Sequence, residues 1–313
     1  MNQPASAESA SAPIDQQLVA RLFARSERLG AADFLLREVA QRMHERLDLL
    51  RLQPQDILDA GAGLGLDALQ LLERWPQARA LALDLAPQRL SQGRRLLAQQ
   101  KQAAQSTLGR VFGRWLGGAR DDDPLIRVAG DYAALPLRPA SLDFLWSNLA
   151  LHWHARPHRV FMEWRRVLRA QGVLMFSCFG PDSLRQLRSA FEYAGLGQAR
   201  VLPFVDMHDL GDMLLAAGFA DPVLDMEMLT LRWRDPQQML EEVRALGGNP
   251  LANRARGLCG RQAWQRMLQA LPRDAEGHYQ MQIEIVYGHA FCPQPKTGGT
   301  GESVLHFMPR PRS

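Results

Sequence analysis

The chain has 313 residues, of which 46% are hydrophobic and 22% charged, a composition typical of a globular protein with a sizeable core. No apolar run reaches 18 residues, so we expect no membrane span. The net charge of +4 comes from arginine, because Lys101 and Lys296 are the only lysines. This small excess permits an acidic partner, although an arginine-rich solvated surface explains it more simply.

The two ends of the chain and its cysteines indicate where the protein resides. Residues 1–14 are small and polar and lack the parts of a secretion signal, so a disordered leader is expected. Residues 293–313 are rich in Pro and Gly, which predicts a flexible tail. Cys178, Cys259 and Cys292 are odd in number and far apart. They favour a reducing, cytoplasmic location over a disulfide framework.

Helices and strands alternate along the first part of the chain. Residues 15–50 place apolar residues at helical spacing and predict two helices. From residue 56 onward, short apolar runs alternate with amphipathic segments. These runs predict five strands, namely "DILDA", "ARALALDLA", 125–129, 142–147 and 173–179, with a helix over 157–169 before the last of them. Strands separated by helices indicate a parallel, doubly wound sheet.

The second part of the chain completes this sheet. Helices are predicted over 182–194, 206–217, 235–246 and 261–270. The runs "VLDMEMLTLRW" and "YQMQIEIVYGHAF" are long and alternating, which suggests antiparallel neighbours at one edge. The fold class expected is therefore α/β, a Rossmann-like doubly wound sheet of seven strands with an antiparallel edge strand. Residues 15–292 are predicted to form a single domain.

A long connection interrupts the alternation at residues 101–124. It contains "GRVFGRWLGGARDDDP", in which aromatic residues lie among arginines and three aspartates follow. We interpret it as an insertion whose aromatic residues pack onto the body of the domain. The alternative is a lid or a docking element for a partner, because long loops without regular structure are often functional.

The turn after the first strand contains Gly61, Gly63 and Gly65. Glycines let the backbone approach a ligand, and the following helix offers free N–H groups. A dinucleotide-binding turn would need Gly or Ala where Leu66 stands. Asp59, directly before the turn, would repel a pyrophosphate but would suit a cationic amino-acid ligand. The turn thus favours a cationic cofactor.

Acidic residues also follow the second and third strands. Asp84, with Leu85 beside it, ends the second strand, where a carboxylate can accept both hydroxyls of a ribose. Asp131 and Tyr132 follow the third strand, where an acid can take an adenine amino group. The alternative is a set of surface aspartates that cap helices. Over residues 56–180 this pattern resembles the class I S-adenosylmethionine-dependent methyltransferases, which implies S-adenosylmethionine as the cofactor.

The fourth strand ends in "SNLALHWH". This run lacks the polar-Pro-Pro-aromatic tetrad that holds an exocyclic amine, which disfavours methylation of nucleic-acid bases. Asn148 is predicted to contact the methionine end of the cofactor. His152 and Trp153 either stand beside the methyl group or pack the start of the next helix. His154 and His158 add to a histidine string, but no carboxylate or cysteine interleaves it, so no metal site is expected.

The segment after the fifth strand reads Gly180-Pro181-Asp182. It lies just past the carboxyl edge of the sheet, where ligands of doubly wound folds enter. Gly180 and Asp182 are therefore weak candidates for the substrate side of the site, and a simple helix start is the alternative.

Three longer motifs carry a closer resemblance: "GDYAALPL", "LDFLWSNLALHW" and "VFMEWRRVLRAQGVLMFSCFGPDSLRQLRSAF". They resemble the BioC-type malonyl-acyl-carrier-protein O-methyltransferases of biotin synthesis. The resemblance implies methylation of the free carboxylate of a malonyl thioester, with an acyl carrier protein as the partner. A carboxylate is already a nucleophile, so alignment and desolvation rather than a general base would carry the rate.

Two other functions remain open from the sequence. "ADFLLREVAQRM", "LPFVDMHDLGDMLLAAGF" and "LGGNPLANR" resemble a mitochondrial complex I assembly factor that keeps the methyltransferase fold but hydroxylates arginine. This second resemblance spans residues 33–290. An RNA-binding methyltransferase relative is a third hypothesis, but no basic-aromatic RNA module is present, so a nucleic-acid partner is not expected. The sequence gives no indication of the catalytic residues or of the oligomeric state.

Overall fold

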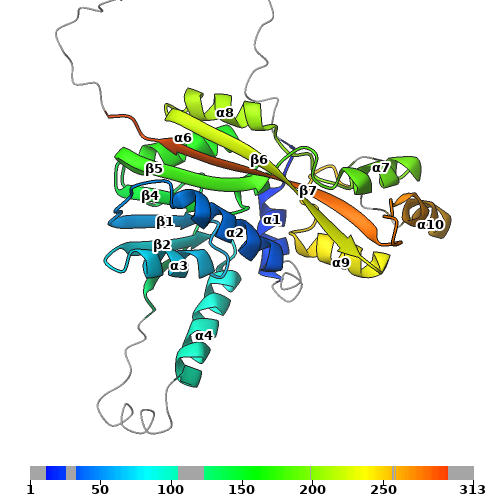
Figure 1. The fold of residues 1–313 in the computed structure, drawn as a ribbon, viewed down its shortest axis with the longest axis horizontal. Coiled ribbons are helices and arrows are strands. Elements are labelled where there is room, and N and C mark those ends of the chain that lie inside the picture. Colours follow the sequence, from blue (N-terminus) through cyan, green and yellow to red (C-terminus); the bar gives the residue numbers. More distant parts are fainter. Residues whose placement is uncertain are drawn as a thin grey trace, which may run out of the picture.

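The computed structural model describes residues 12–25, 33–104, 123–197, 199–255, 257 and 259–294. These residues form one seven-stranded sheet in the order β3-β2-β1-β4-β5-β7-β6, with helices on both faces (Figure 1). The strands are β1 (Asp56–Ala60), β2 (Arg79–Asp84), β3 (Leu125–Ala129), β4 (Leu142–Ser147), β5 (Leu168–Phe179), β6 (Ala220–Trp233) and β7 (Tyr279–Phe291). In the described part of the chain, no helix combines the length and apolarity needed to cross a membrane.

The helices alternate with the strands as the sequence predicts. They are α1 (Gln16–Ala24), α2 (Asp33–Leu47), α3 (Leu66–Arg74), α4 (Pro87–Ala104), α6 (Pro157–Val167), α7 (Arg185–Tyr193), α8 (Met207–Ala216), α9 (Pro236–Ala245) and α10 (Arg261–Ala270), with a short 3₁₀ helix η2 (Leu151–Trp153) after β4. The greater part of the predicted leader, insertion and tail lies outside the described residues, which omit 1–11, 105–122 and 295–313.

The predicted doubly wound sheet with an antiparallel strand is confirmed. Strands β1 to β5 are parallel, and β7 is antiparallel to both of its neighbours. The antiparallel strand β7 lies one place inside the edge, between β5 and β6, and β6 forms the edge itself. This order agrees with burial, because β7 is buried along most of its length whereas Trp233 is the only buried residue of β6.

Strand β5 begins at Leu168, earlier than the predicted strand over 173–179, and it includes Gln171 and Gly172, which lie between that strand and the predicted helix over 157–169. These two residues pair instead with Cys292, directly after β7. The Gln171 N–H donates to the Cys292 carbonyl over 2.8 Å, and the Cys292 N–H donates to the Gly172 carbonyl over 2.9 Å. Strand β5 bulges at this point. Its register with β4 shifts between Leu168 and Val173, and Gln171 has a φ of 65°. A distant partner thus extends the strand.

Two apolar cores cover the two faces of the sheet. Successive residues of each central strand point to opposite faces, so Ile57 joins one core and Leu58 joins the other. The first core packs under α2 and α3 and continues to α7. The second core packs under α6 and α8, where Phe161 and Trp164 are fully buried. Both faces are therefore dry, which accounts for the near-continuous apolar strands.

Helix α1 and one end of the β6–β7 pair, where Trp233 lies opposite Tyr279, complete the fold near the carboxyl ends of the parallel strands. The β6–β7 pair extends beyond the other strands, and α7, α9 and α10 lie around its far end (Figure 1). A third apolar cluster joins Val19 of α1 to Trp153, Leu202 and Leu251. Ile14, which the sequence assigns to the leader, forms an antiparallel bridge with Leu251. These contacts hold α1 against the body of the sheet.

Candidate cofactor and acceptor site

A cavity of about 330 Å³ lies at the carboxyl ends of β1, β2 and β4, beneath α1 and α2. It is large enough for a cofactor-sized ligand. Among the residues lining it are eight of the nine predicted cofactor residues: Asp59, Gly61, Gly63, Asp84, Leu85, Asp131, Tyr132 and Asn148. Trp153, a predicted substrate-side residue, lines it too, and the remaining cofactor candidate, Gly65, does not.

The glycine turn owes its shape to close backbone packing. The N–H groups of Gly61 and Ala62 donate to the Leu83 carbonyl over 2.8 and 2.9 Å, which fastens the turn to β2. Gly61 has a φ of 83°, and a Cβ there would lie 2.3 Å from the Cβ of Ala150. Gly65 has a φ of 78° and precedes α3. Both positions therefore require glycine, and at Gly61 the backbone forms the wall of the cavity.

Asp84 is held in place by the turn that it faces. Its Oδ2 accepts the Gly63 N–H over 2.8 Å, and its Oδ1 accepts the Ala86 N–H over 2.7 Å. Burial raises the pKa of Asp84, and these two hydrogen bonds offset the rise only in part. Each carboxylate oxygen can still accept a second hydrogen bond, which suits a pair of ligand hydroxyls.

Asp59 is the acid of the cavity whose surroundings oppose its negative charge most clearly. It is 2% exposed, and its Oδ2 has no hydrogen-bond partner among the described groups. Burial, followed by the charges of Asp67 and Asp84, raises its pKa well above the usual value. Asp67, on α3, accepts hydrogen bonds from the Trp146 indole and the Asn148 amide, each over 3.0 Å. Acids crowded in this way are stabilised by a cationic ligand.

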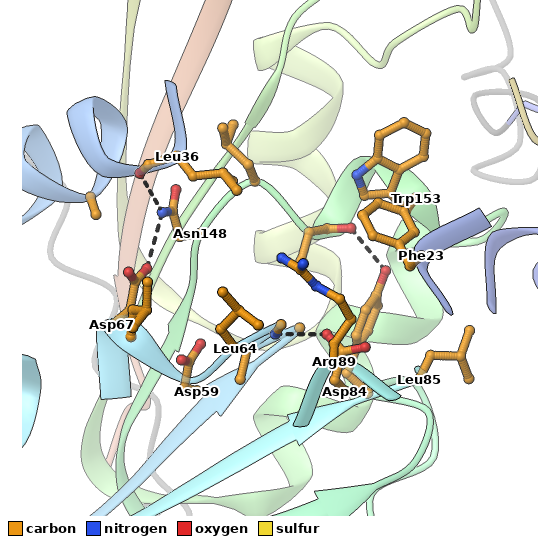
Figure 2. Close-up of a pocket in the computed structure, with 18 of the residues that line it drawn as sticks. Phe23, Leu36, Asp59, Leu64, Asp67, Asp84, Leu85, Arg89, Asn148 and Trp153 are labelled. Carbon is orange, nitrogen blue, oxygen red and sulfur yellow. Dashed lines mark hydrogen bonds between the residues drawn. The ribbon is translucent and has the colours of Figure 1, made fainter. Parts of the chain in front are cut away.

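Asn148 and Tyr132 line the cavity, but their polar groups already have partners. The Asn148 amide donates to the Leu36 carbonyl over 3.0 Å as well as to Asp67, and its oxygen accepts from the Ser177 hydroxyl over 2.9 Å. The Tyr132 hydroxyl donates to the Ala150 carbonyl over 2.9 Å. Both side chains therefore position other parts of the cavity. Figure 2 shows Asn148 between Leu36 and Asp67.

Asp131 retains more freedom. Its Oδ1 accepts the Ala133 N–H over 2.8 Å, while its Oδ2 lies 4.0 Å from the His154 Nε2. The second oxygen can therefore accept a further hydrogen bond from a ligand amine.

Arg89 is a site residue that the sequence does not single out. It belongs to the first turn of α4 and is only 6% exposed, and its Nε has no hydrogen-bond partner in the described part of the chain. Burial lowers its pKa, and the charges of Asp33 and Asp84 oppose the change. Figure 2 shows its side chain extending into the cavity from beside Asp84. Its position five residues after Asp84 is the only sequence signal.

A small junction cavity of about 40 Å³ adjoins the cofactor cavity. The two share Phe23, Leu36, Arg89, Leu149 and Trp153. The junction also shares Trp153, Phe179 and Leu246 with a second large cavity of about 420 Å³. A continuous set of lining residues thus leads from the cofactor cavity to a separate chamber near α7, α9 and α10.

His152 lines this junction. Its Nδ1 accepts the Phe179 N–H over 3.3 Å, which places the ring proton on Nε2. That nitrogen is buried and has no described partner. Burial lowers the pKa of His152 to about 3, so the ring is neutral at physiological pH. His152 therefore carries an uncharged donor without an acceptor in the described part of the chain, and its ring packs against those of Trp153 and Phe179.

Gly180 and Asp182 lie apart from these cavities and pack against β7. A Cβ on Gly180 would lie 2.4 Å from the Glu284 carboxyl carbon, and the Gly180 N–H donates to the Glu284 carbonyl. The Asp182 N–H donates to the Glu284 side chain over 2.8 Å, and the Asp182 carboxylate pairs with Arg185 at 3.5 Å. The structure thus places both candidates in the loop between β5 and α7, in contact with β7.

Comparison with known proteins identifies the class of protein to which this fold belongs. A family model described as "Methyltransferase domain" matches residues 58–176, which carry the glycine turn, Asp84, Asp131 and Asn148. A candidate methyltransferase from Bacillus halodurans C-125 superposes with a TM-score of 0.52, at 16% identity over 82% of this chain and 99% of its own. The YcgJ protein of Bacillus subtilis gives 0.51, at 11% identity over 85% and 99%. These structures support the fold, and the protein is an S-adenosylmethionine-dependent methyltransferase with the class I fold.

Curated relatives narrow the class to a family. The malonyl-[acyl-carrier protein] O-methyltransferase of Gallionella capsiferriformans is 41% identical over 93% of this chain and 96% of its own. The protein of the same name from Laribacter hongkongensis is 43% identical over 89% and 90%. The chain belongs to the malonyl-[acyl-carrier protein] O-methyltransferase family. This result confirms the BioC-type resemblance over the assembly-factor and RNA-binding alternatives.

Proposed function

We propose that this protein transfers the methyl group of S-adenosylmethionine to the free carboxylate of malonyl-acyl carrier protein, in biotin biosynthesis. The observation that carries the proposal is the similarity, at 41% and 43% identity, to two malonyl-[acyl-carrier protein] O-methyltransferases over about nine-tenths of each chain. The cytoplasm is the proposed location, in keeping with three free cysteines.

The cofactor cavity fits S-adenosylmethionine in charge and shape. In this proposal Asp84 accepts the ribose hydroxyls, Leu85 contacts the adenine and Asp131 accepts the adenine amino group. Asp59, whose buried Oδ2 lacks a partner, and Asp67 balance the positive charge of the methionine end. The backbone at Gly61 and Gly63 allows the close approach. When bound, the cofactor supplies an electrophilic methyl group on a positively charged sulfur.

The acceptor carboxylate is proposed to reach the methyl group through the junction cavity. A carboxylate needs no base to become a nucleophile, which agrees with a junction histidine that stays neutral at physiological pH. In this proposal the His152 Nε2–H and the Arg89 guanidinium each hold a carboxylate oxygen. The charges of carboxylate and sulfonium cancel as the methyl group moves, so the water-excluding rings of Phe23 and Trp153 favour the reaction.

Genetic complementation tests the proposed activity in a cell. A bacterial strain that lacks its malonyl-acyl-carrier-protein methyltransferase requires biotin, and this protein should restore growth without biotin. A Gly61→Val variant provides the control, because a larger side chain would fill the cofactor cavity against Ala150. Failure to restore growth by protein that is folded and binds S-adenosylmethionine would contradict the proposal.

A further inference from the structure

The second large cavity has a distinctive lining. It occupies about 420 Å³ among α1, α7, α9, α10 and the segment before α8. Four arginines line it: Arg25, Arg200, Arg244 and Arg254. The rest of the described lining is mainly apolar, and none of the described lining residues is acidic. We call it the arginine cavity.

The arginines of this cavity have no carboxylate partner among the described residues, unlike several arginines elsewhere in the protein. Arg166 pairs with Glu163, and Arg169 pairs with two aspartates, as is usual for half-exposed guanidinium groups. None of the four cavity arginines forms an ion pair with a carboxylate in the described part of the chain. The two partly buried ones donate only to backbone carbonyls: Arg200 to Leu196 over 2.9 Å and Arg254 to Leu251 over 3.5 Å.

We propose that the arginine cavity binds the phosphopantetheine arm of the acyl carrier substrate, with the arginines on its phosphate. The inference rests on the proposed function and assigns a second site to it. The arm carries one phosphodiester and a chain of amides and methylene groups, which matches a cavity with arginines and apolar walls. A guanidinium group binds two phosphate oxygens at once through its planar set of N–H donors.

The order of the cavities fixes the direction of the arm. Trp153, Phe179 and Leu246 line both the arginine cavity and the junction, and Trp153 also lines the cofactor cavity. The malonyl carboxylate must end beside the methyl group, at the junction. The thioester chain therefore runs back past Trp153 and Phe179, which leaves the phosphate as the substrate anion within the arginine cavity.

Two substrates that differ only in the phosphate test this assignment. Malonyl-phosphopantetheine and malonyl-pantetheine would be compared as methyl acceptors with the whole protein. Each charge-assisted hydrogen bond lost should weaken binding about ten-fold or more, so the Arg200→Gln/Arg254→Gln variant, which removes two, should raise KM for malonyl-phosphopantetheine roughly a hundred-fold or more. The KM for malonyl-pantetheine should stay unchanged. Arg159→Gln, at an exposed position on α6 that lines none of these cavities, should affect neither substrate.

A second variant protects the test against misfolding. Arg25 and Arg244 are exposed, and their side chains have no hydrogen-bond or ion-pair partner among the described residues, so Arg25→Gln/Arg244→Gln should fold normally. It should show the same selective rise in KM. Unchanged calorimetric affinity for S-adenosylmethionine in both variants would show that the cofactor cavity is intact.

The alternatives give different results. An equal rise in KM for both substrates would overturn the assignment and place the malonyl carboxylate on the arginines. No rise in either variant would overturn it as well. If the wild type methylated neither substrate nor the carrier-bound one, the proposed function would fail. Calorimetry with phosphopantetheine and pantetheine tests the cavity separately, because the assignment requires tighter binding of the phosphorylated compound whatever the turnover.

Discussion

Replacing Asp59 with asparagine should stabilise the protein without its cofactor and weaken its binding of S-adenosylmethionine. The two effects have one origin. The Asp59 carboxylate is buried, has an oxygen without a partner, and is repelled by the charges of Asp67 and Asp84. Asparagine has nearly the same shape and no charge. It therefore removes the repulsion in the empty cavity together with the attraction for a cation.

The sizes of both effects follow from the contacts. A buried polar group without a partner costs about 1–3 kcal/mol. If the neutral amide recovers about 1 kcal/mol of this, the melting temperature should rise by about 2 °C for a domain of this size. Loss of one interaction with a charged partner, worth about 1.5–3 kcal/mol, should weaken binding of S-adenosylmethionine roughly ten- to hundred-fold.

The pH dependence gives a further check on the sign. Because the folded-state pKa of Asp59 is raised above the unfolded value of 3.8, ionisation of this group opposes folding. Its contribution to stability therefore falls as the pH rises from the unfolded value through the folded one. Over the same window the cavity gains negative charge, so affinity for the cationic cofactor should increase. In Asp59→Asn, stability and affinity for S-adenosylmethionine should both depend less steeply on pH.

Thermal unfolding and calorimetry across this pH range measure both quantities. Asp209→Asn is the matched control, because Asp209 is an exposed residue on α8 that lines none of the cavities. An Asp59→Asn protein with wild-type affinity for S-adenosylmethionine and wild-type stability would refute the reasoning. It would mean that Asp59 neither experiences the repulsion nor faces the cofactor.

Three further variants separate the roles of individual positions. Gly61→Ala should reduce S-adenosylmethionine binding at least tenfold, because its Cβ would lie 2.3 Å from that of Ala150. Gly197→Ala, at a φ of 75° with no atom within 4 Å of the new Cβ, controls for backbone strain, and equal losses in both would contradict a close approach at Gly61. His152→Asn should raise KM for the acceptor about tenfold, as expected for a lost hydrogen bond to a carboxylate, and leave the pH profile near neutrality unchanged, because the pKa of His152 is about 3. Loss of an ionisation near pH 6.5 in this variant, but not in the exposed His208→Asn, would identify His152 as a base instead. Gly180→Ala should destabilise the protein by about 1–3 kcal/mol through its clash with Glu284, and it should leave the KM for S-adenosylmethionine and the KM for the acceptor unchanged. A normally stable Gly180→Ala protein with a raised acceptor KM would instead support a substrate-side role.

The acidic part of the site could be predicted because it depends on strand ends. Asp59 is the last residue but one of β1, Asp84 ends β2, and Asp131 follows β3. The carboxyl ends of parallel strands meet at one edge, so alternation of helices and strands was enough to bring these residues together. The glycine turn identified the edge, since only a close backbone approach requires so many glycines in a few residues.

The helical part of the site could not be predicted in the same way. Arg89 and Asp67 reach the cavity only because of how α4 and α3 dock on the sheet, and a sequence pattern does not fix that docking. Asn148 could be predicted at the site but not its partners, because the Leu36 carbonyl belongs to α2, 112 residues away. Long-range packing thus decides which polar groups remain available to a ligand.

The same limit applies to the C-terminal strands. Two antiparallel strands could be predicted from their length and alternation, but their order depends on pairing with β5. The segment of β7 from Ile283 to Ala290, which is apolar apart from Glu284 and His289, is the signal for an interior strand, because all of it except His289 is buried. Gly180 is explained by this order too, since β7 brings Glu284 against it.

The central claim is tested most directly by mass spectrometry of an acyl carrier protein after incubation with this protein and S-adenosylmethionine. The account predicts that a malonyl-loaded carrier gains one methyl group, as an ester on the free carboxylate. An acetyl-loaded carrier, which lacks that carboxylate, should remain unchanged. An unmodified malonyl carrier, in the presence of protein that demonstrably binds S-adenosylmethionine, would contradict the account.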